Sequence, residues 1–191
     1  MTAAKRRLRV DAARRTLRRM AAAMQQPPIT LHLNGIIGES IRPDAIEARL
    51  ARNQFSPVTI RLDSTGGIVA DAVEIYRMLR AHLAPVSVIV TGDCKSAATL
   101  LLLAADYRSS KRWARFLLHQ PAFGAHAKPE RWTASILRSG ALALEAASDT
   151  MAQIIEDRTD IPTSRVRKML AAETRLTAHE AADLGLIHFV E

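Results

Sequence analysis

The chain has 191 residues, 48% of them hydrophobic, and a formal net charge of +8. This length is typical of one domain that can bury a substantial core. The charge is uneven: residues 1–28 carry eight Lys and Arg against Asp11 alone, a net +7, which leaves +1 for residues 29–191. A body that binds nucleic acid needs a basic face of its own, so the composition argues against nucleic-acid binding outside the N-terminal segment.

The number of cysteines and the length of the apolar runs indicate in which cellular compartment the protein is expected. The single cysteine, Cys94, excludes an internal disulfide and a cysteine-based metal cluster, and it fits a reducing cytoplasm. No apolar run approaches the roughly 18 residues that a membrane-spanning helix needs. The basic N-terminus is not followed by the apolar region of a signal peptide. We therefore expect a cytoplasmic protein without membrane contact, metal or bound cofactor.

The N-terminal segment 1–28 is typical of a basic amphipathic helix. Its apolar residues recur three or four positions apart, and arginines fill the opposite face: Val10, Ala13, Leu17, Met20 and Met24. The two prolines at its end disfavour further helix. We interpret the segment as an arm that is solvated or packs on a neighbouring subunit. Binding to nucleic acid or an anionic surface is the first alternative, and a targeting role is the second.

From residue 29 the pattern changes to alternating strands and helices. The sequence predicts strands at 29–33, 58–62, 86–90, 114–118 and 187–190. It predicts helices at 43–53, 68–82, 96–105, 129–159, 162–172 and 178–184. Strands separated by helices indicate βαβ units, a mainly parallel sheet and an α/β fold.

Three segments that follow predicted strands carry candidate chemistry. Residues 63–67 end in Gly66-Gly67, which permit a sharp turn and expose backbone N–H groups to an anion or a developing oxyanion. Ser96 stands at the start of a predicted helix, where the role of an N-cap is the alternative to that of a nucleophile. His119 follows a strand, at the end where ligands bind to parallel sheets. Taken singly, each feature also fits a purely structural role.

In this order and at these intervals the segments resemble the proteolytic subunit of the Clp protease, ClpP. The resemblance rests on Ser64-Thr65-Gly66-Gly67, Gly92-x-x-x-Ser96, Leu118-His119-Gln120-Pro121, and a closing stretch, Leu176-Thr177-Ala178-His179-Glu180-Ala181 followed by Leu184-Gly185-Leu186-Ile187. It covers residues 29–191 as one peptidase domain, leaves the arm outside, and is nearest to a divergent or phage-type member.

The resemblance implies a ClpP/crotonase-like spiral of βαβ units with a protruding long helix, the handle, at about 129–159. Six apolar residues of this helix are expected at an interface or in the core: Trp132, Ile136, Leu137, Leu142, Leu144 and Met151.

The resemblance also assigns roles to five residues. Ser96 matches the nucleophile, His119 its general base, and Glu173 the acid that orients the base. The backbone N–H groups of Gly67 and Ala97 match the oxyanion hole. Three other acids, on the preceding helix and loop, are weaker alternatives for the third position: Glu156, Asp157 and Asp160.

The activity that the resemblance implies is that of a serine endopeptidase cleaving unfolded polypeptides through an acyl-enzyme. The subunits would form a homo-oligomeric ring, a hexamer or heptamer, single or double. ATP would enter only through a separate AAA+ unfoldase partner. Two alternatives are a non-catalytic ClpP-like subunit or scaffold and a crotonase-like acyl-CoA enzyme. The presence of both Ser96 and His119 argues against each of them.

The chain differs from the ClpP pattern in three regions. Thr59 and Arg61 replace aromatic residues that help to receive loops of the ATPase, which weakens the expectation of the usual docking. Gly124 alone remains of a glycine-rich strand after the histidine motif, which weakens the expectation of a double ring. Lys95 replaces a small residue before Ser96. A Ser–Lys dyad is disfavoured, because adjacent residues at a helix start point in different directions.

Overall fold

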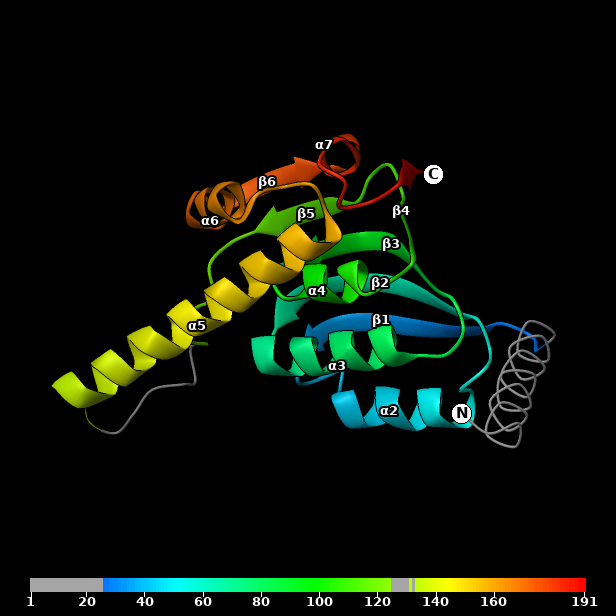
Figure 1. Ribbon diagram of the computed structural model, residues 1–191, viewed down its shortest axis with the longest axis horizontal. Helices are drawn as coiled ribbons and strands as arrows, with labels where there is room; N and C mark the ends of the chain where they lie inside the picture. Colours follow the sequence, from blue (N-terminus) through cyan, green and yellow to red (C-terminus); the bar gives the residue numbers. More distant parts are fainter. Residues whose placement is uncertain (1–25, 125–130, 132) are drawn as a thin grey trace, which may run out of the picture.

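The computed structural model describes residues 26–124, 131 and 133–191. The predicted N-terminal helix therefore falls almost wholly outside the described residues. In chain order the elements are β1 (Ile29–Ile37), α2 (Pro43–Arg52), β2 (Val58–Gly67), α3 (Val69–Ala81), β3 (Val86–Lys95), α4 (Ala98–Leu103), β4 (Tyr107–Ser110), β5 (Arg115–Leu118), α5 (Ala134–Arg158), α6 (Thr163–Ala171), β6 (Thr174–Thr177), α7 (Ala178–Asp183) and β7 (Phe189–Val190) (Figure 1).

The seven strands form one sheet in which β3 is shared by two neighbours. The order β1-β2-β3-β4-β7 is parallel throughout. The first half of β3 pairs with β4, whereas its last three residues, Asp93–Lys95, pair with β5. β6 then adds to β5 in the antiparallel sense. The expected α/β fold with a mainly parallel sheet is confirmed, and the β5–β6 pair is its antiparallel exception.

Three strands, β1, β2 and β3, extend beyond their predicted ends, and the extensions of β2 and β3 determine where the candidate site lies. Residues 63–67 were expected to form a loop, but they continue β2, because β1 pairs with it as far as Ile37–Gly67. β3 likewise continues to Lys95 instead of ending at Val90. The prediction missed this because Gly, Asp and Ser are poor strand formers, and pairing with neighbouring strands overrides their preference.

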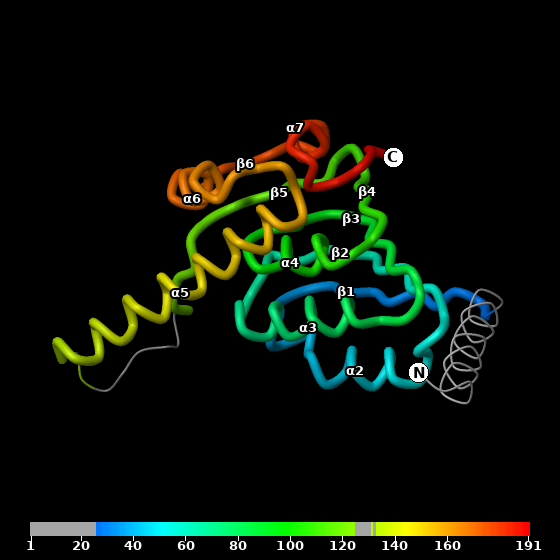
Figure 2. Tube along the Cα trace, in the orientation of Figure 1, coloured from blue at the N-terminus to red at the C-terminus, as the bar shows by residue number. Residues whose placement is uncertain are grey.

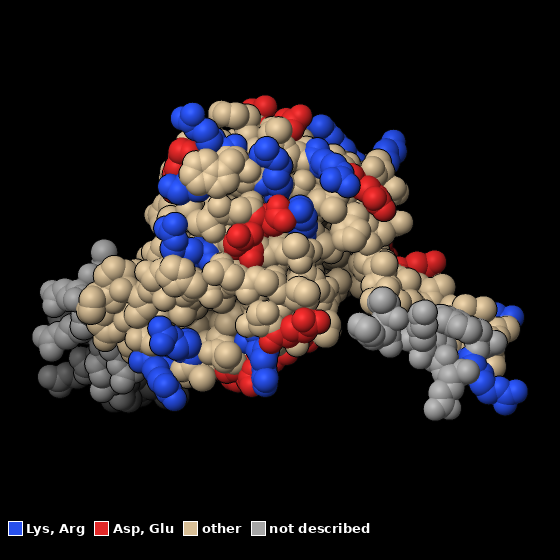
Figure 3. Space-filling view, turned by 180° about the vertical axis from the view of Figure 1, so that it is seen from behind, with Lys and Arg blue, Asp and Glu red and all other residues tan. Residues whose placement is uncertain are grey.

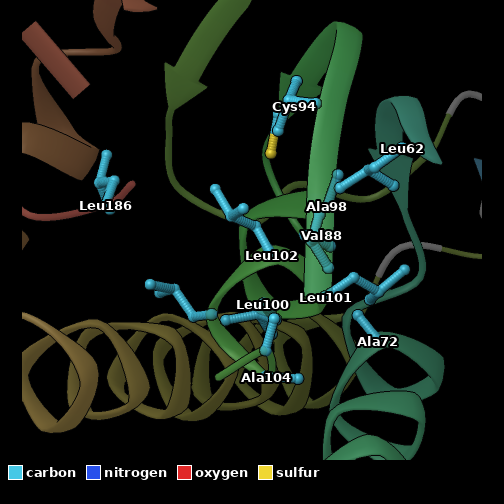
Figure 4. Close-up of a cluster of buried hydrophobic side chains, with 14 of the residues drawn as sticks. Leu62, Ala72, Val88, Cys94, Ala98, Leu100, Leu101, Leu102, Ala104 and Leu186 are labelled. Atoms are coloured by element: carbon cyan, nitrogen blue, oxygen red, sulfur yellow. The ribbon is translucent and has the colours of Figure 1, made fainter. Parts of the chain in front are cut away.

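The centre of the core is the short helix α4. All six of its residues are buried, and leucine side chains leave it in several directions (Figure 4). A helix that is apolar all round must be surrounded by other elements. Residues of β2, β3 and α3 pack in the same cluster, among them Leu62, Val88 and Ala72. This packing fixes the position of the segment that precedes α4, in which Ser96 and Ala97 lie.

Two arginines connect the end of α5 to the body of the molecule. Arg158 donates from Nε to the carbonyl of Leu103 (2.8 Å) and from Nη2 to that of Ala105 (2.8 Å). Arg108 donates from Nη2 to the carbonyls of Arg158 (3.2 Å) and Gly185 (3.1 Å). Burial and the nearby Arg158 lower the pKa of Arg108 to about 10, still far above neutrality. Arg108 therefore remains cationic, and both side chains donate to carbonyls that the helix ends leave free.

The helix α5 extends well beyond the rest of the described chain, as the expected handle does (Figures 1 and 2). Only residues near its end are buried, such as Met151 and Ile155. Near its start the exposed fractions of Ile136, Leu137 and Leu142 are 41%, 54% and 65%. These apolar side chains face solvent in the single chain. Trp132, expected to join them, lies outside the described residues.

The described surface has no single-sign character on the face seen in Figure 3, where basic and acidic side chains are interspersed. No helix among the described residues is long and apolar enough to cross a membrane.

Candidate active site

The carboxyl ends of β2, β3 and β5 meet at one place in the sheet. Ser64 of β2 lies opposite Cys94 of β3, and Lys95 of β3 lies opposite Leu117 of β5. The N–H of Ser96 continues this ladder by donating to the carbonyl of Leu117 at 2.8 Å. The residue after β3 is therefore held between the glycine end of β2 and the end of β5.

The backbone of Ser96 adopts a conformation that is uncommon for residues with a side chain. Its φ is +55°, in the left-handed region, and the residue is 8% exposed. Among the described non-glycine residues, only Ser96 and Glu173 have a positive φ. Such conformations cost about 1–3 kcal/mol and cluster at functional sites, where surrounding structure enforces them. The predicted N-cap role is not observed, because α4 has no side-chain cap hydrogen bond.

The two glycines of β2 permit close approaches that a side chain would prevent. A Cβ on Gly66 would lie 2.7 Å from Cβ of Ser96, and one on Gly67 would lie 2.1 Å from the carbonyl oxygen of Ile37. The N–H of Gly66 donates to Oγ of Ser64 at 3.1 Å. Sequence reasoning assigned the pair to a turn and matched Gly67 alone to the oxyanion hole, and it missed that Gly66 is the residue packed against Ser96.

Ala97 is fully buried at the N-cap of α4. Within the part of the chain that the structure describes, no hydrogen bond engages its N–H. The geometry thus leaves a backbone donor directly after Ser96. The neighbouring Cys94 is also buried, and burial raises the pKa of its thiol. A protonated, inaccessible thiol is a poor nucleophile, so the serine is the candidate at this site.

His119 and Glu173 occupy matching positions on two adjacent strands. The antiparallel register of β5 and β6 ends at Leu118 opposite Thr174, and His119 and Glu173 are the next residues beyond this pair. Directly opposed residues in such a pair have Cβ atoms about 4.5–5.5 Å apart. His119 is half-buried and Glu173 is exposed. The fold thus brings the ends of three neighbouring strands, which carry Ser96, His119 and Glu173, to one edge.

No hydrogen bond connects the side chains of these three residues within the described part of the chain. Among the described residues, no hydrogen bond joins Ser96 to His119 or His119 to Glu173. Catalytic hydrogen bonds are often long in unliganded proteins and tighten only with substrate. In the single chain the three candidate residues therefore lie at the ends of neighbouring strands without hydrogen bonds between them.

Glu173 owes its conformation to the end of α6. Its N–H donates to the carbonyl of Leu170 at 3.3 Å, and Oγ1 of Thr174 donates to that of Met169 at 2.9 Å. This pattern is a left-handed helix cap, a position that usually holds glycine. Glu173 has a φ of +49° there.

The alternative acids have other functions or positions. Glu156 accepts the N–H of Thr163 at 3.0 Å and also its hydroxyl, which lowers the pKa of the Glu156 carboxyl and caps α6. Asp157 accepts from Gln153 on the exposed side of α5 at 2.8 Å. Asp160 is exposed in the loop before α6. The strand register places none of the three opposite His119, and it favours Glu173.

Lys95 does not point toward the hydroxyl of Ser96. Its Nζ forms an ion pair with Oδ2 of Asp93 at 2.6 Å. The geometry gives no support to a Ser–Lys dyad. The structure also contains no group of three or more His, Cys, Asp or Glu residues that could hold a metal ion, within the residues it describes.

Comparison with known proteins places this arrangement in a family. Residues 45–191 match the sequence profile of the family described as Clp protease. The chain is 31% identical over 160 residues to the ATP-dependent Clp protease proteolytic subunit 2 of Treponema denticola, covering 81% of the chain and 78% of the relative. It is 32% identical over 133 residues to the protein of the same name from Treponema pallidum, covering 69% of the chain and 64% of that relative, slightly under two thirds of its length.

A solved structure agrees with these matches at the level of the fold. A mutant ClpP1 subunit from Listeria monocytogenes superposes with a TM-score of 0.74 at 23% identity, over 85% of this chain and 90% of that chain. The fold is thus that of ClpP. The chain belongs to the Clp protease family.

Proposed function

We propose that this chain is a serine endopeptidase that cleaves unfolded polypeptides, with Ser96 as nucleophile, His119 as general base and Glu173 as the acid that orients the base. One observation carries the proposal: the registers of β3 with β5 and of β5 with β6 bring the ends of the three strands together. The left-handed backbone of Ser96, unusual for a serine, supports the same role.

The proposed reaction follows from these positions. Oγ of Ser96 attacks the carbonyl carbon of the peptide while the imidazole of His119 takes the hydroxyl proton. The N–H groups of Gly67 and Ala97 stabilise the oxyanion, and one such donor contributes about 3–4 kcal/mol to lowering the barrier. The amine product leaves with the proton from His119, and an acyl ester on Ser96 remains. In the second half, His119 takes a proton from a water molecule that attacks the ester carbon, the bond to Oγ breaks, and Ser96 regains its proton from His119 as the acid product leaves. No cofactor is required.

We further propose that the triad aligns when the chain assembles into a homo-oligomeric ring. Members of the Clp protease family typically form rings, and the exposed leucines near the start of α5 offer apolar surface for such contacts. Substrate would come as unfolded polypeptide in the cytoplasm, supplied by an AAA+ unfoldase. The surface around Arg61 is polar, because Glu191 there accepts hydrogen bonds from Lys111 and Ser109, both at 2.7 Å. These bonds, and to a smaller extent the charge of Arg61, lower the pKa of the Glu191 carboxyl.

A fluorophosphonate probe tests the nucleophile. We expect the oligomeric protein to react at Ser96, and Ser96→Ala to abolish both labelling and peptide cleavage. Ser164→Ala, which changes an exposed serine of α6, is the matched control and should keep both. Labelling that persists in Ser96→Ala would contradict the assignment.

A non-catalytic ClpP-like subunit is the second candidate. The missing hydrogen bonds between Ser96, His119 and Glu173 favour it. It predicts that no assembly state of the wild-type chain reacts with the probe, whereas the peptidase proposal predicts reaction in the ring.

A further inference from the structure

The outer surface of the β3–β5–β6 part of the sheet carries three basic side chains. Successive strand residues point to opposite faces, and Cys94, Phe116 and Leu176 are the buried ones here. The opposite face holds Lys95 beside Leu117 and Arg175 in one row, and Arg115 in the next row. These residues surround a surface hollow of about 340 Å³, together with Thr177 and Glu180.

Two acidic side chains lie at or beside this hollow, Asp93 and Glu180, and each already has a partner within the chain. Oδ2 of Asp93 pairs with Lys95 at 2.6 Å. Oε2 of Glu180 accepts from the N–H and the hydroxyl of Thr177, at 2.7 Å and 2.8 Å, in the capping box of α7. These bonds lower the pKa of the Glu180 carboxyl. Each acid therefore has its charge engaged by groups of its own strand or helix end.

The two arginines have donors to spare. Arg115 uses Nη1 on the carbonyl of Trp113 at 2.8 Å and, more weakly, on that of Ala114 at 3.4 Å. Arg175 is exposed and forms no ion pair with any acid that the structure describes. A guanidinium presents five N–H donors in a fixed fork that matches a carboxylate. The hollow thus offers directed donors above an aliphatic floor, the side chain of Leu117.

The hollow is close in sequence to the proposed catalytic residues. Arg175 of β6 is two residues after Glu173, and Lys95 directly precedes Ser96. Cα atoms of consecutive residues are about 3.8 Å apart, so those of residues two apart are at most about 7.6 Å apart. An extended polypeptide advances about 3.3–3.6 Å per residue. A substrate that reacts with Ser96 therefore reaches the hollow within about two or three residues of the bond that is cleaved.

We propose that this basic hollow is a subsite for a carboxylate of the polypeptide substrate, and that Arg175 and Arg115 make the chain prefer acidic residues at one position near the cleaved bond. The inference rests on the proposed peptidase function and adds the class of side chain that the site selects. The carboxylate comes either from an Asp or Glu side chain or from the substrate's own C-terminus, because both present the same two oxygens.

Matched fluorogenic peptides test the subsite. Each pair differs only by Glu or Gln at one of the three positions on either side of the cleaved bond, and a further pair differs by a free or amidated C-terminus. We expect the wild-type oligomer to prefer the carboxylate member about fivefold in kcat/KM at one position at low salt, mostly through KM. This preference should decrease as salt is added, since the hollow is open to solvent.

Variants assign the preference to the arginines. Arg175→Gln and Arg115→Gln should each reduce it to about twofold or less, while cleavage of the Gln peptides and labelling by the probe stay near wild type. Arg52→Gln, at the exposed end of α2, should leave the preference unchanged. A preference within the Glu/Gln pairs would identify a side chain as the source of the carboxylate. A preference within the pair with free and amidated ends would identify the C-terminus.

Three results would overturn the inference, and they distinguish failure of the subsite alone from failure of the proposed peptidase function. Cleavage of all peptides without a charge preference, or a preference that both arginine variants retain, overturns the subsite alone. Absence of both probe labelling and cleavage in the wild-type oligomer overturns the peptidase proposal and the subsite with it.

Discussion

Glu173 combines a proposed catalytic role with an unfavourable backbone conformation. A left-handed residue with a side chain costs roughly 1–2 kcal/mol relative to a right-handed one, and glycine is the usual residue at this helix cap. The sequence pattern predicted which residue aligns with the family's acid, but it carried no sign of the positive φ. That feature arises because α6 ends and β6 begins within three residues.

Two replacements of Glu173 distinguish its effect on the free energy of unfolding from its proposed effect on peptidase activity. Glu173→Gly should raise the free energy of unfolding by about 1 kcal/mol by relieving the backbone, while peptidase activity falls. Glu173→Ala removes the same carboxylate but keeps the strained φ, so it should lose activity without the gain in stability. Denaturant unfolding and peptide cleavage measure the two effects. Equal stability of the two variants would contradict the strain at this residue.

The variant Gly66→Ala tests whether the close approach of Gly66 to Ser96, the proposed nucleophile, is needed. Gly66→Ala would put a Cβ 2.7 Å from that of Ser96 at a φ of +99°. We expect a loss of probe labelling and a destabilisation of about 1–3 kcal/mol. Gly124→Ala is the matched control, because its added Cβ meets nothing within 4 Å. Normal labelling in Gly66→Ala would mean that the backbone there moves freely.

At the level of elements, the pairing of β4 with the C-terminal strand makes stability sensitive to pH. Nδ1 of His188 accepts the N–H of Arg108 at 3.2 Å, and the N–H of His188 donates to the carbonyl of Arg108 at 2.8 Å. Burial, Arg108 and Arg158 lower the pKa of His188 in the folded chain. Nδ1 can accept this hydrogen bond only while the imidazole ring is neutral. The charges of the two nearby arginines oppose protonation of the ring.

The direction in which stability changes with pH follows from the linkage between proton binding and folding. A histidine whose pKa is lowered by folding contributes its full stability above the ordinary pKa of about 6.5 and loses it as pH falls through the lower, folded-state value. Wild-type protein should thus lose stability from pH 7 to pH 5, and His188→Asn, a non-titrating acceptor, should lose less. Thermal unfolding across this range measures it. Identical slopes would remove His188 as a cause.

Some helices and strands could be predicted from the local sequence pattern, whereas others could not. The helix α3 and the first half of β3 were predicted because their apolar periodicity is strong. The strands β4 and β6 were missed, since they have four residues each, mostly polar, and depend on partners distant in sequence. The site shares this limit: motif spacing named Ser96 and His119, whereas their juxtaposition depends on the β3–β5 register.

At the scale of the whole molecule, α5 carries large apolar side chains that are exposed within the described part of the chain. The double variant Leu137→Glu with Leu142→Glu should prevent assembly while the monomer stays folded, since both residues are exposed. Light scattering gives the mass and circular dichroism the fold, and activity per chain should fall with assembly. Arg138→Glu, on the same helix, is the control. An unchanged mass in the double variant would assign assembly to another surface.

The division of β3 between two neighbours has a consequence for control of the chemistry. The proposed nucleophile and both proposed oxyanion donors belong to the part built on β2 and β3, whereas the proposed base follows β5 and the proposed acid precedes β6. The two parts meet along the short seam from Asp93 to Lys95. A slight shear at this seam would leave the described helices and strands intact and yet separate the proposed nucleophile from the proposed base. Under the proposed function, a newly made subunit would therefore be fully folded but inactive until contacts with neighbouring subunits close the seam.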